Sequence, residues 1–379
     1  MSDQSRTQLS DERPATESAR SIRAKIVSIG ANLFRWSIWA IVLVFAVWAL
    51  GATWWLPFFP AWLQIFATLS LAVWYGWLIW HALTDVNPLV HRALIAATAC
   101  FILLVTLLAQ PSLDRDWAAD QSRLPDVSIV DDVVEIGNYR HSQYRSESDF
   151  DVRWSTKSFE LDRIQRVWFL VQRFAPTDGL AHVFLSFELA STNQQPADYI
   201  CLSIEIRREV GESYGPIKGL YRVYEIIHVF GDERDLIGVR TVHRPNDRVY
   251  LFPLNATPSQ AQQLFQRFAD RTSKLAKSPE FYHTLLNNCA NGLTRQTYQM
   301  TQQPINWLDP RIVLPGFSAQ FAHELQLIGE PQSDETFELL EQRCRIDQHA
   351  RVIGITASFS QDIRAHMKFQ RQPDTDLPR

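Results

Sequence analysis

Charged side chains are almost absent from one long part of this 379-residue chain: between Trp36 and Gln110, only Asp85 and Arg92 carry charge. The rest has ordinary charge, so the chain's averages, a formal net charge of −4 and a mean hydropathy of −0.14, resemble those of a soluble protein. Surface helices of a soluble bundle have a polar face, and the uncharged segments have none. They are predicted to lie in a membrane, with helices buried in a soluble bundle as the alternative.

The uncharged part divides into three runs, each close to the roughly 20 apolar residues that a helix needs to cross the bilayer. The runs are expected at about Trp36–Leu56, Trp62–Leu83 and Ala93–Ala109. They predict a three-helix membrane anchor over residues 34–110, preceded by a loose cytoplasmic tail over residues 1–30.

Positive charge predicts the orientation of this anchor. The residues before the first run include Arg20, Arg23 and Lys25, and Arg92 lies between the second and third runs, whereas the turn between the first two runs has no Lys or Arg. The positive-inside rule then keeps the N-terminus in the cytoplasm. Three crossings place everything after Gln110 in the periplasm of a bacterium with its anchor in the inner membrane. The first run starts too far into the chain to be a cleaved signal peptide.

The rest of the chain is predicted to be α+β, an antiparallel sheet with helices packed on it. Residues 111–150 are expected to form a connector with one β-like run, residues 151–365 the domain, and residues 366–379 a loose tail. Alternating or apolar runs predict strands at 182–188, 199–206, 220–227 and 248–254, with a polar turn at 231–236. Helical patterns are expected in part of 154–173, from Thr257, near 287–299, in part of 315–329, and at 334–343.

Several functional motifs are missing. The sequence has no HExxH, no CxxC, no histidine–cysteine cluster with zinc spacing, and no glycine-rich phosphate loop. Basic residues are scattered rather than gathered on one segment, so nothing supports nucleic-acid binding. We therefore expect no metal, no cofactor and no nucleic-acid partner.

Three of the four cysteines have simple interpretations. Cys100 fills an apolar run, and Cys201 lies between apolar neighbours in an expected strand. Cys344 follows a charged helix and gives no signal of its own. A disulfide between Cys201 and Cys344 stays open for an oxidising compartment.

Cys289 is the candidate nucleophile. It follows Asn287 and Asn288, either of which can cap the helix expected there. Cys289 then lies in the first turn, where unpaired N–H groups and the helix dipole favour the reactive thiolate. The alternative is a small buried apolar residue at a helix start.

A nucleophilic cysteine needs a base, and the candidates are His182, His228, His243 and His283. His182 is preferred because it opens a strand directly after a turn, where a polar side chain can face a cleft. A third group must orient the imidazole. Glu205 is the first choice and Ser203, on the same strand face, the second. The alternatives are a structural histidine and a salt bridge through Glu205.

A combination of segments, rather than any one, resembles the Lnb-type N-terminal periplasmic domain family across about Trp154–Phe321. The segments are 181–187, 203–207, 219–221, 231–235 and 281–289. The resemblance implies that residues 151–365 form a circularly permuted papain-like domain of the NlpC/P60 type, in which the histidine strand precedes the cysteine helix. The order His182, Glu205, Cys289 fits that permutation.

The resemblance also implies a function, because a named member of that family is implicated in the N-acylation of bacterial lipoproteins. We expect a membrane-anchored acyltransferase that takes an acyl group from a phospholipid or lipoprotein as a thioester on Cys289. His182 would move the proton, Glu205 would orient His182, and the N–H of Cys289 would help to hold the oxyanion. The alternatives are a cysteine peptidase or amidase acting on peptidoglycan and a non-catalytic envelope scaffold.

Overall fold

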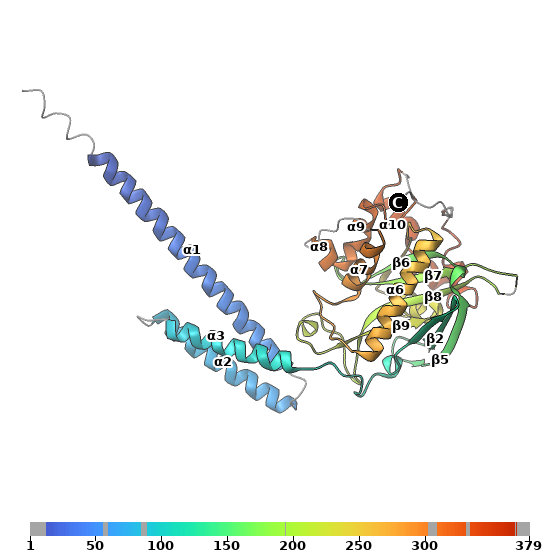
Figure 1. Ribbon diagram of the computed structural model, residues 1–379, viewed down its shortest axis with the longest axis horizontal. Helices are drawn as coiled ribbons and strands as arrows, with labels where there is room; N and C mark the ends of the chain where they lie inside the picture. The colour runs from blue at the N-terminus through green and yellow to red at the C-terminus, as the bar shows by residue number, and fades with distance from the viewer. Residues whose placement is uncertain are drawn as a thin grey trace, which may run out of the picture. The chain divides into compact units, whose positions relative to one another are not determined.

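The computed structural model describes residues 13–55, 60–84, 89–193, 195–301, 309–330, 334–367 and 369. The chain divides into two compact units, Met1–Gln110 and Pro111–Arg379 (Figure 1). Each unit has its own core, so each is described by itself.

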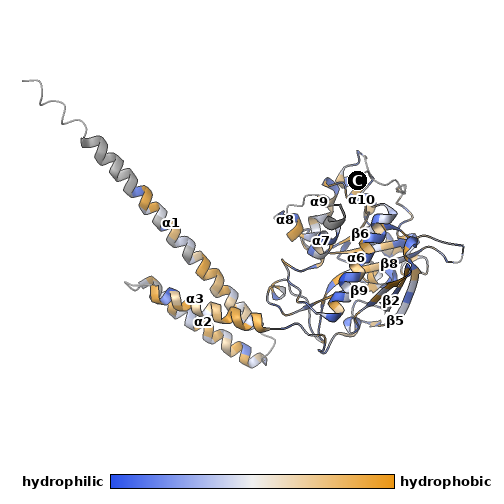
Figure 2. Cartoon of the chain, in the orientation of Figure 1, coloured by the Kyte–Doolittle hydropathy of each residue, from blue (hydrophilic) through white to orange (hydrophobic). Residues whose placement is uncertain are grey.

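The first unit consists of three long helices, α1 (Arg13–Trp54), α2 (Ala61–Thr84) and α3 (Leu89–Leu108). The parts long and apolar enough to cross a membrane are Lys25–Trp54, Ala61–His81 and Leu89–Leu108, which confirms the three predicted spans. Figure 2 shows apolar colour along all three helices.

Small residues let these helices pack closely. Ala46 and Ala49 of α1 are buried against Tyr75 and Leu78 of α2 and Ile95 of α3. Such contacts are typical of helices that associate in lipid, where small side chains allow backbones to approach. Large apolar side chains elsewhere on the three helices stay exposed, as expected for surfaces that face lipid.

The loose tail predicted for residues 1–30 is wrong from Arg13 onward, because α1 begins there. Residues 1–12 lie outside the described part, as does Leu56, the expected end of the first span. The physical reason is that lengthening an existing helix needs no new nucleus. The segment before the first apolar run contains good helix formers such as Ala, Arg and Glu, which join the helix that follows.

The second unit is built on an eight-stranded sheet in the order β1–β2–β9–β8–β7–β6–β10, with β5 also pairing with β2. Neighbouring strands are antiparallel except β2 and β9, which pair in parallel through Arg140 and Gly231. A separate hairpin pairs β3 with β4. The strands are β1 (Asp126–Val130), β2 (Val133–Arg140), β3 (Gln143–Tyr144), β4 (Phe150–Asp151), β5 (Trp154–Glu160), β6 (Ile164–Arg173), β7 (Ala181–Leu189), β8 (Asp198–Arg207), β9 (Glu225–Gly231) and β10 (Arg248–Pro253).

Helices pack on this sheet (Figure 1), which confirms the α+β class. The α-helices are α4 (Glu233–Leu236), α5 (Gly238–Val242), α6 (Pro258–Lys277), α7 (Cys289–Thr301), α8 (Pro310–Val313), α9 (Ser318–Glu324), α10 (Phe337–Cys344), α11 (Asp347–Ile353) and α12 (Phe359–Asp362). Single 3₁₀ turns are η1 (Ala119–Gln121), η2 (Leu161–Arg163), η3 (Lys218–Leu220) and η4 (Pro315–Phe317).

Each face of the sheet packs against a different set of helices. On one face, Phe187 and Phe230 meet Phe265 of α6 edge-on, and α7 continues this layer over β7 and β8. On the other face, Phe184 joins a core with side chains of α4, α11 and α12. Because side chains alternate along a strand, His182 shares the face of Phe184, and Val183 points the opposite way.

The helix predicted from Thr257 is confirmed in detail as α6. The Thr257 side chain accepts from the N–H of Gln260, whose side chain accepts from the N–H of Thr257, and Pro258 occupies the first turn. This capping box satisfies N–H groups that the helix itself cannot pair. Leu264 and Phe265 form the buried stripe.

Two predicted segments have the wrong secondary structure. Residues 154–173, expected to be helical in part, form β5, η2 and β6. Nearly every residue of β6 is buried, so the alternation that marks a strand is missing from its sequence. The polar turn at 231–236 is mostly α4, which Asp232 caps by accepting from the N–H of Arg234.

Three boundaries also differ. The connector expected at 111–150 contains β1 and β2, which are part of the main sheet. The strand expected at 220–227 begins only at Glu225. In the tail expected at 366–379, Met367 is buried, and the ring of Phe369 packs against Trp168. Residues 368 and 370–379 lie outside the described part.

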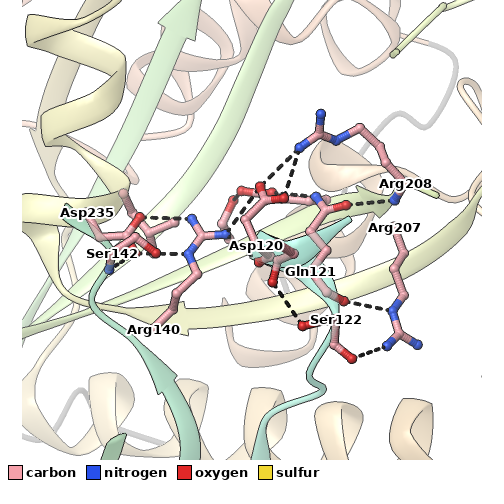
Figure 3. A network of polar contacts seen from close by, with 12 residues as sticks. Asp120, Gln121, Ser122, Arg140, Ser142, Arg207, Arg208 and Asp235 are labelled. Atoms are coloured by element: carbon pink, nitrogen blue, oxygen red, sulfur yellow. Dashed lines mark hydrogen bonds and ion pairs between the residues drawn. The ribbon is translucent and has the colours of Figure 1, made fainter. Parts of the chain in front are cut away.

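A fully buried ion pair joins β2 to α4 (Figure 3). Arg140 donates from Nε and Nη2 to the two carboxylate oxygens of Asp235, at 2.9 and 3.0 Å. The backbone N–H of Ser142 donates to the same carboxylate at 2.7 Å. Removing one partner of such a pair leaves a buried charge without compensation, which is strongly destabilising.

We predict that Asp235→Asn lowers the free energy of unfolding by about 3–5 kcal/mol, because it strands the buried guanidinium of Arg140. The measurement is a urea titration of the full chain in detergent, followed by pulsed labelling of the buried Cys344 thiol. Asp149→Asn is the control, since it breaks an exposed pair with Arg145 and should leave the midpoint unchanged. Equal midpoints for the two variants would contradict the prediction.

Candidate active site

The candidate nucleophile stands at the start of α7. The Asn288 side chain accepts from the N–H of Asn291 at 2.9 Å, and its carbonyl accepts from the N–H of Gly292 at 2.9 Å. Asn288 is therefore the N-cap and Cys289 the first helical residue. Asn287, the other expected cap, instead donates from its side chain to the carbonyl of Phe281 at 2.9 Å.

A glycine lets this end of α7 lie directly against the sheet. A Cβ atom at Gly292 would lie 2.7 Å from the Cδ1 atom of Ile204, a buried residue of β8. Because Gly292 has no Cβ atom, the first turns of α7 lie close to β7 and β8. The backbone N–H of Val183 hydrogen-bonds to the sulfur of Cys289. Val183 is the chain neighbour of His182, so the approach sets Cys289 beside the start of β7.

Cys289 is 6% exposed, and this burial raises the pKa of its thiol above the ordinary value. The backbone N–H groups of Val183, Ala290 and Cys289 itself act in the opposite direction but do not outweigh burial. The N–H groups at the helix start thus favour the thiolate, as expected, but burial keeps the pKa of Cys289 above its ordinary value. At neutral pH the sulfur carries its proton and needs a base to remove it.

The base candidate His182 is the first member of a hydrogen-bonded chain. Its Nε2 lies 2.7 Å from the Ser203 hydroxyl, which donates to Oε1 of Glu205 at 2.8 Å. Ser203, the second choice as orienting residue, is thus the direct partner of the imidazole. Glu205, the first choice, is linked to the imidazole through the Ser203 hydroxyl.

The charge state of Glu205 determines, through Ser203, which nitrogen of His182 carries the proton. Burial raises the pKa of Glu205, but attraction by Arg240 and Arg140 outweighs it and holds that pKa well below its usual range. An ionised carboxylate only accepts, so Ser203 donates to it and its oxygen accepts from His182. The proton then sits on Nε2, which leaves Nδ1 as the free basic nitrogen.

His182 itself is neutral at pH 7. Burial, together with the positive charges of Arg240 and Arg244, lowers its pKa to about 3, although Glu205 pulls in the other direction. The resting site therefore combines an uncharged imidazole with an uncharged thiol. In a reaction at Cys289, the thiol proton would therefore pass to a base as the sulfur attacks.

His182, Glu205 and Cys289 line one cavity of about 1200 Å³. The β7–β8 ladder begins at Phe184 and Ser203, so the cavity lies at the end of the sheet where these strands have separated. The three residues that the sequence singled out as catalytic candidates thus all belong to the lining of this cavity.

The other candidate bases have different surroundings. His228 is on the sheet face that packs against α6 and contacts the hydroxyl of Thr272 at 2.7 Å. Nδ1 of His283 accepts from the N–H groups of Leu285 and Leu286, both at 3.2 Å, and so shapes the loop before Cys289. Neither histidine lines the cavity that holds Cys289.

Sequence reasoning missed two residues of the site. Gln121 of η1 donates to Oε2 of Glu205 at 3.2 Å, and its own Oε1 accepts from the N–H of Arg208 at 2.7 Å. Arg240 of α5 donates to Oε1 of Glu205 at 2.6 Å. Gln121 comes from the stretch expected to be a connector, and no motif marks either residue.

A network of arginines holds the turn that carries Gln121 (Figure 3). The Arg140 side chain donates to the carbonyl of Asp120, and the Arg207 side chain to the carbonyls of Gln121 and Ser122, at 2.9–3.0 Å. Arg208 pairs with the carboxylate of Asp120 at 3.0 Å. The turn is thereby fixed over the polar end of the His182–Ser203–Glu205 chain.

The remaining cysteines are free thiols. Cys201 and Cys344 are both buried and unbridged, so the structure does not contain the disulfide that the sequence left open. Across the described ranges, no group of three or more His, Cys, Asp or Glu side chains could hold a metal ion.

Residues 150–308 match the family model described as the Lnb N-terminal periplasmic domain. The second unit of this chain carries a domain of that family. The matched segment contains His182, Ser203, Glu205 and Cys289, whereas Gln121 lies before it. Together with the three apolar helices, the match makes the chain a membrane protein with a periplasmic domain. No curated protein and no solved structure matches the chain.

The raised pKa of Cys289 leads to a pH prediction. Below that pKa, the thiolate fraction grows about tenfold per pH unit, so the rate of alkylation by iodoacetamide should rise with that slope from pH 6 to 8. The rate is measured by mass spectrometry of the peptide containing Cys289. A rate that stays constant above pH 6 would instead reveal a preformed thiolate.

Removing the Ser203 hydroxyl should disable the base while keeping the fold. Cys289 is expected to attack a p-nitrophenyl ester and release nitrophenolate in a burst. We predict that Ser203→Ala lowers the rate constant of this burst by roughly 100-fold, within the range typical of general-base catalysis. Ser186→Ala is the matched control, because Ser186 is equally buried but bonds to Glu233 outside the cavity. Equal bursts from the two variants would show that His182 does not depend on Ser203.

Proposed function

We propose that the protein is a membrane-anchored periplasmic Cys–His enzyme that transfers an acyl group, taken from a phospholipid or lipoprotein, through a thioester on Cys289. The observation that carries this proposal is the shared cavity. It contains a thiol at a helix start and an imidazole oriented through Ser203 by an ionised carboxylate. A nucleophile, its base and an orienting group are the components that thiol acyl transfer needs.

In the proposed reaction, Nδ1 of His182 takes the thiol proton as Sγ of Cys289 attacks the ester carbonyl of the donor. The imidazolium that forms is stabilised through Ser203 by Glu205, and it returns the proton to the leaving alcohol. An amine then attacks the thioester, gives its proton to His182, and leaves as the amide while the thiol is restored. The N–H of Cys289, at the start of α7, would hold the oxyanion.

The lining of a second pocket supports an acyl donor. This pocket of about 70 Å³ is lined mostly by apolar side chains, among them Val183, Leu185, Ala290 and Leu293. Val183 and Ala290 are the chain neighbours of His182 and Cys289, so apolar surface begins directly beside the thiol. A pocket of this size suits the first methylene groups of an acyl chain.

Two further parts of the proposal rest on the sequence. The order of His182, Ser203 and Glu205 before Cys289 fits a permuted papain-like arrangement. The positive charges before α1 favour a cytoplasmic N-terminus, with the second unit in the periplasm.

One observation favours a second candidate, a cysteine peptidase or amidase acting on peptidoglycan. The large cavity is lined by many charged side chains, including Asp120, Arg240, Arg244 and Asp247. Such a lining suits a polar peptide as well as the polar acceptor of an acyl transfer. The reaction steps on Cys289 and His182 would be the same for both candidates.

The deciding experiment incubates the full chain in phospholipid vesicles with a synthetic peptide that bears a diacylglyceryl cysteine, or with a cross-linked peptidoglycan fragment. We predict a fatty-acyl thioester on Cys289, released by neutral hydroxylamine, and an N-acylated peptide, both detected by mass spectrometry. The thioester should be missing from Cys289→Ala and His182→Ala. It should persist in the control Cys344→Ala, which removes a buried thiol outside the cavity.

The other outcomes are distinct. Cleavage of the peptidoglycan fragment without an N-acylated peptide would replace acyl transfer with the second candidate. If neither product forms and Cys289 carries no adduct, both enzyme proposals fail, and the non-catalytic envelope scaffold remains.

A further inference from the structure

Large apolar side chains are exposed on two loops beside the cavity that holds Cys289. Val210, Tyr214 and Ile217 lie between β8 and β9, and Leu285 and Leu286 lie just before α7. Leu286 is 65% exposed, Val210 63% and Ile217 62%. Val210 and Tyr214 also line the cavity itself. These five side chains are called the apolar rim below.

The two loops form one surface. The N–H of Thr284 donates to the carbonyl of Gly219 at 3.0 Å, and its hydroxyl donates to the carbonyl of Pro216 at 2.7 Å. A Cβ atom at Gly219 would lie 2.4 Å from the Thr284 hydroxyl, so the glycine permits this close contact. The ring of Tyr214 meets that of Tyr282 edge-on, at 6.3 Å between centroids. The rim is therefore held together by contacts within the second unit.

The chain leaving the third apolar helix is bonded to the same loops. α3 ends at Leu108, and the N–H of Ser112 already donates to Glu225, which pairs with Phe281. Four residues later, the carbonyl of Asp116 accepts from the N–H of Val210 at 2.8 Å. Four extended residues span at most about 14 Å. Whatever the arrangement of the two units, this covalent length keeps Ser112 close to the end of the last apolar helix.

We infer that the apolar rim inserts into the surface of the lipid bilayer and so sets the opening of the Cys289 cavity against the membrane. Exposed apolar side chains gathered at one site mark an interaction surface, and burying them at the acyl boundary of a bilayer is favourable. The short tether selects lipid over other partners as the surface that the rim meets. The inference rests on the proposed function in one respect: it takes the bilayer as the source of the acyl donor.

The first test compares two alkylating reagents on the full chain in nanodiscs of phosphatidylethanolamine and phosphatidylglycerol. Iodoacetamide reaches Cys289 from water, whereas N-hexadecyl-iodoacetamide reaches it from the bilayer. The double variant Leu285→Asp, Leu286→Asp should lose at least tenfold in the rate with the hexadecyl reagent and keep the rate with iodoacetamide within twofold, which also shows that it folds. The control Val352→Asp, 84% exposed on α11, should change neither rate.

An unchanged hexadecyl rate in the double variant would overturn the inference. If Cys289 in the unaltered protein resists both reagents, the proposed function fails, and the rim is tested by a measurement that needs no chemistry at Cys289. A nitroxide on Leu286→Cys, in a chain with Cys100→Ala, should be relaxed more strongly by oxygen than by a water-soluble nickel complex. The same label on Val352→Cys should show the reverse. Equal accessibility to nickel at both positions would place the rim in water and overturn the inference.

Discussion

The site depends on one close approach, that of the first turns of α7 to the end of the sheet. Gly292 favours it, because a Cβ atom there would lie 2.7 Å from Cδ1 of Ile204 and would force that side chain to shift. The approach sets Cys289 against the backbone N–H of Val183, the residue that follows His182. Asn288 begins the helix at this point and thereby fixes which residue meets the strand. A cap, a missing Cβ and a strand end together place the sulfur at the cavity.

The electrostatics of the site follow from its burial. A thiol and an imidazole shielded from water both favour their neutral forms, as the raised pKa of Cys289 and the lowered pKa of His182 show. Glu205 stays charged despite its burial, chiefly because the positive charges of Arg240 and Arg140 lower its pKa. In the proposed reaction, this negative charge stabilises, through Ser203, the imidazolium that forms when His182 takes a proton. Arg140 also holds the Asp120 backbone, so one buried cation supports both the fold and the site.

Elements with strong local signals were predicted correctly. Long uncharged runs predicted the three apolar helices, the Thr257 cap predicted α6, and Asn287-Asn288-Cys289 predicted the start of α7. Signals that need tertiary context failed. The strand β6 is buried on both faces and so lacks alternation, and β1 and β2 join the sheet from a stretch that reads as a polar connector. Gln121 could not be found because its partner Glu205 is 84 residues away. The order of Ser203 and Glu205 behind His182 likewise depends on how the strands pair.

The central claim of the proposal is that His182 removes the thiol proton of Cys289 as its sulfur attacks the acyl carbon. The most direct measurement treats the full chain with 1,3-dibromoacetone, which joins a thiol and an imidazole through a short bridge, and maps the product by mass spectrometry. The account predicts a single cross-link between the peptides that contain Cys289 and His182. In His182→Ala, it predicts only a simple adduct on Cys289. A bridge from Cys289 to another residue such as His283, or only the simple adduct in the unaltered protein, would contradict it.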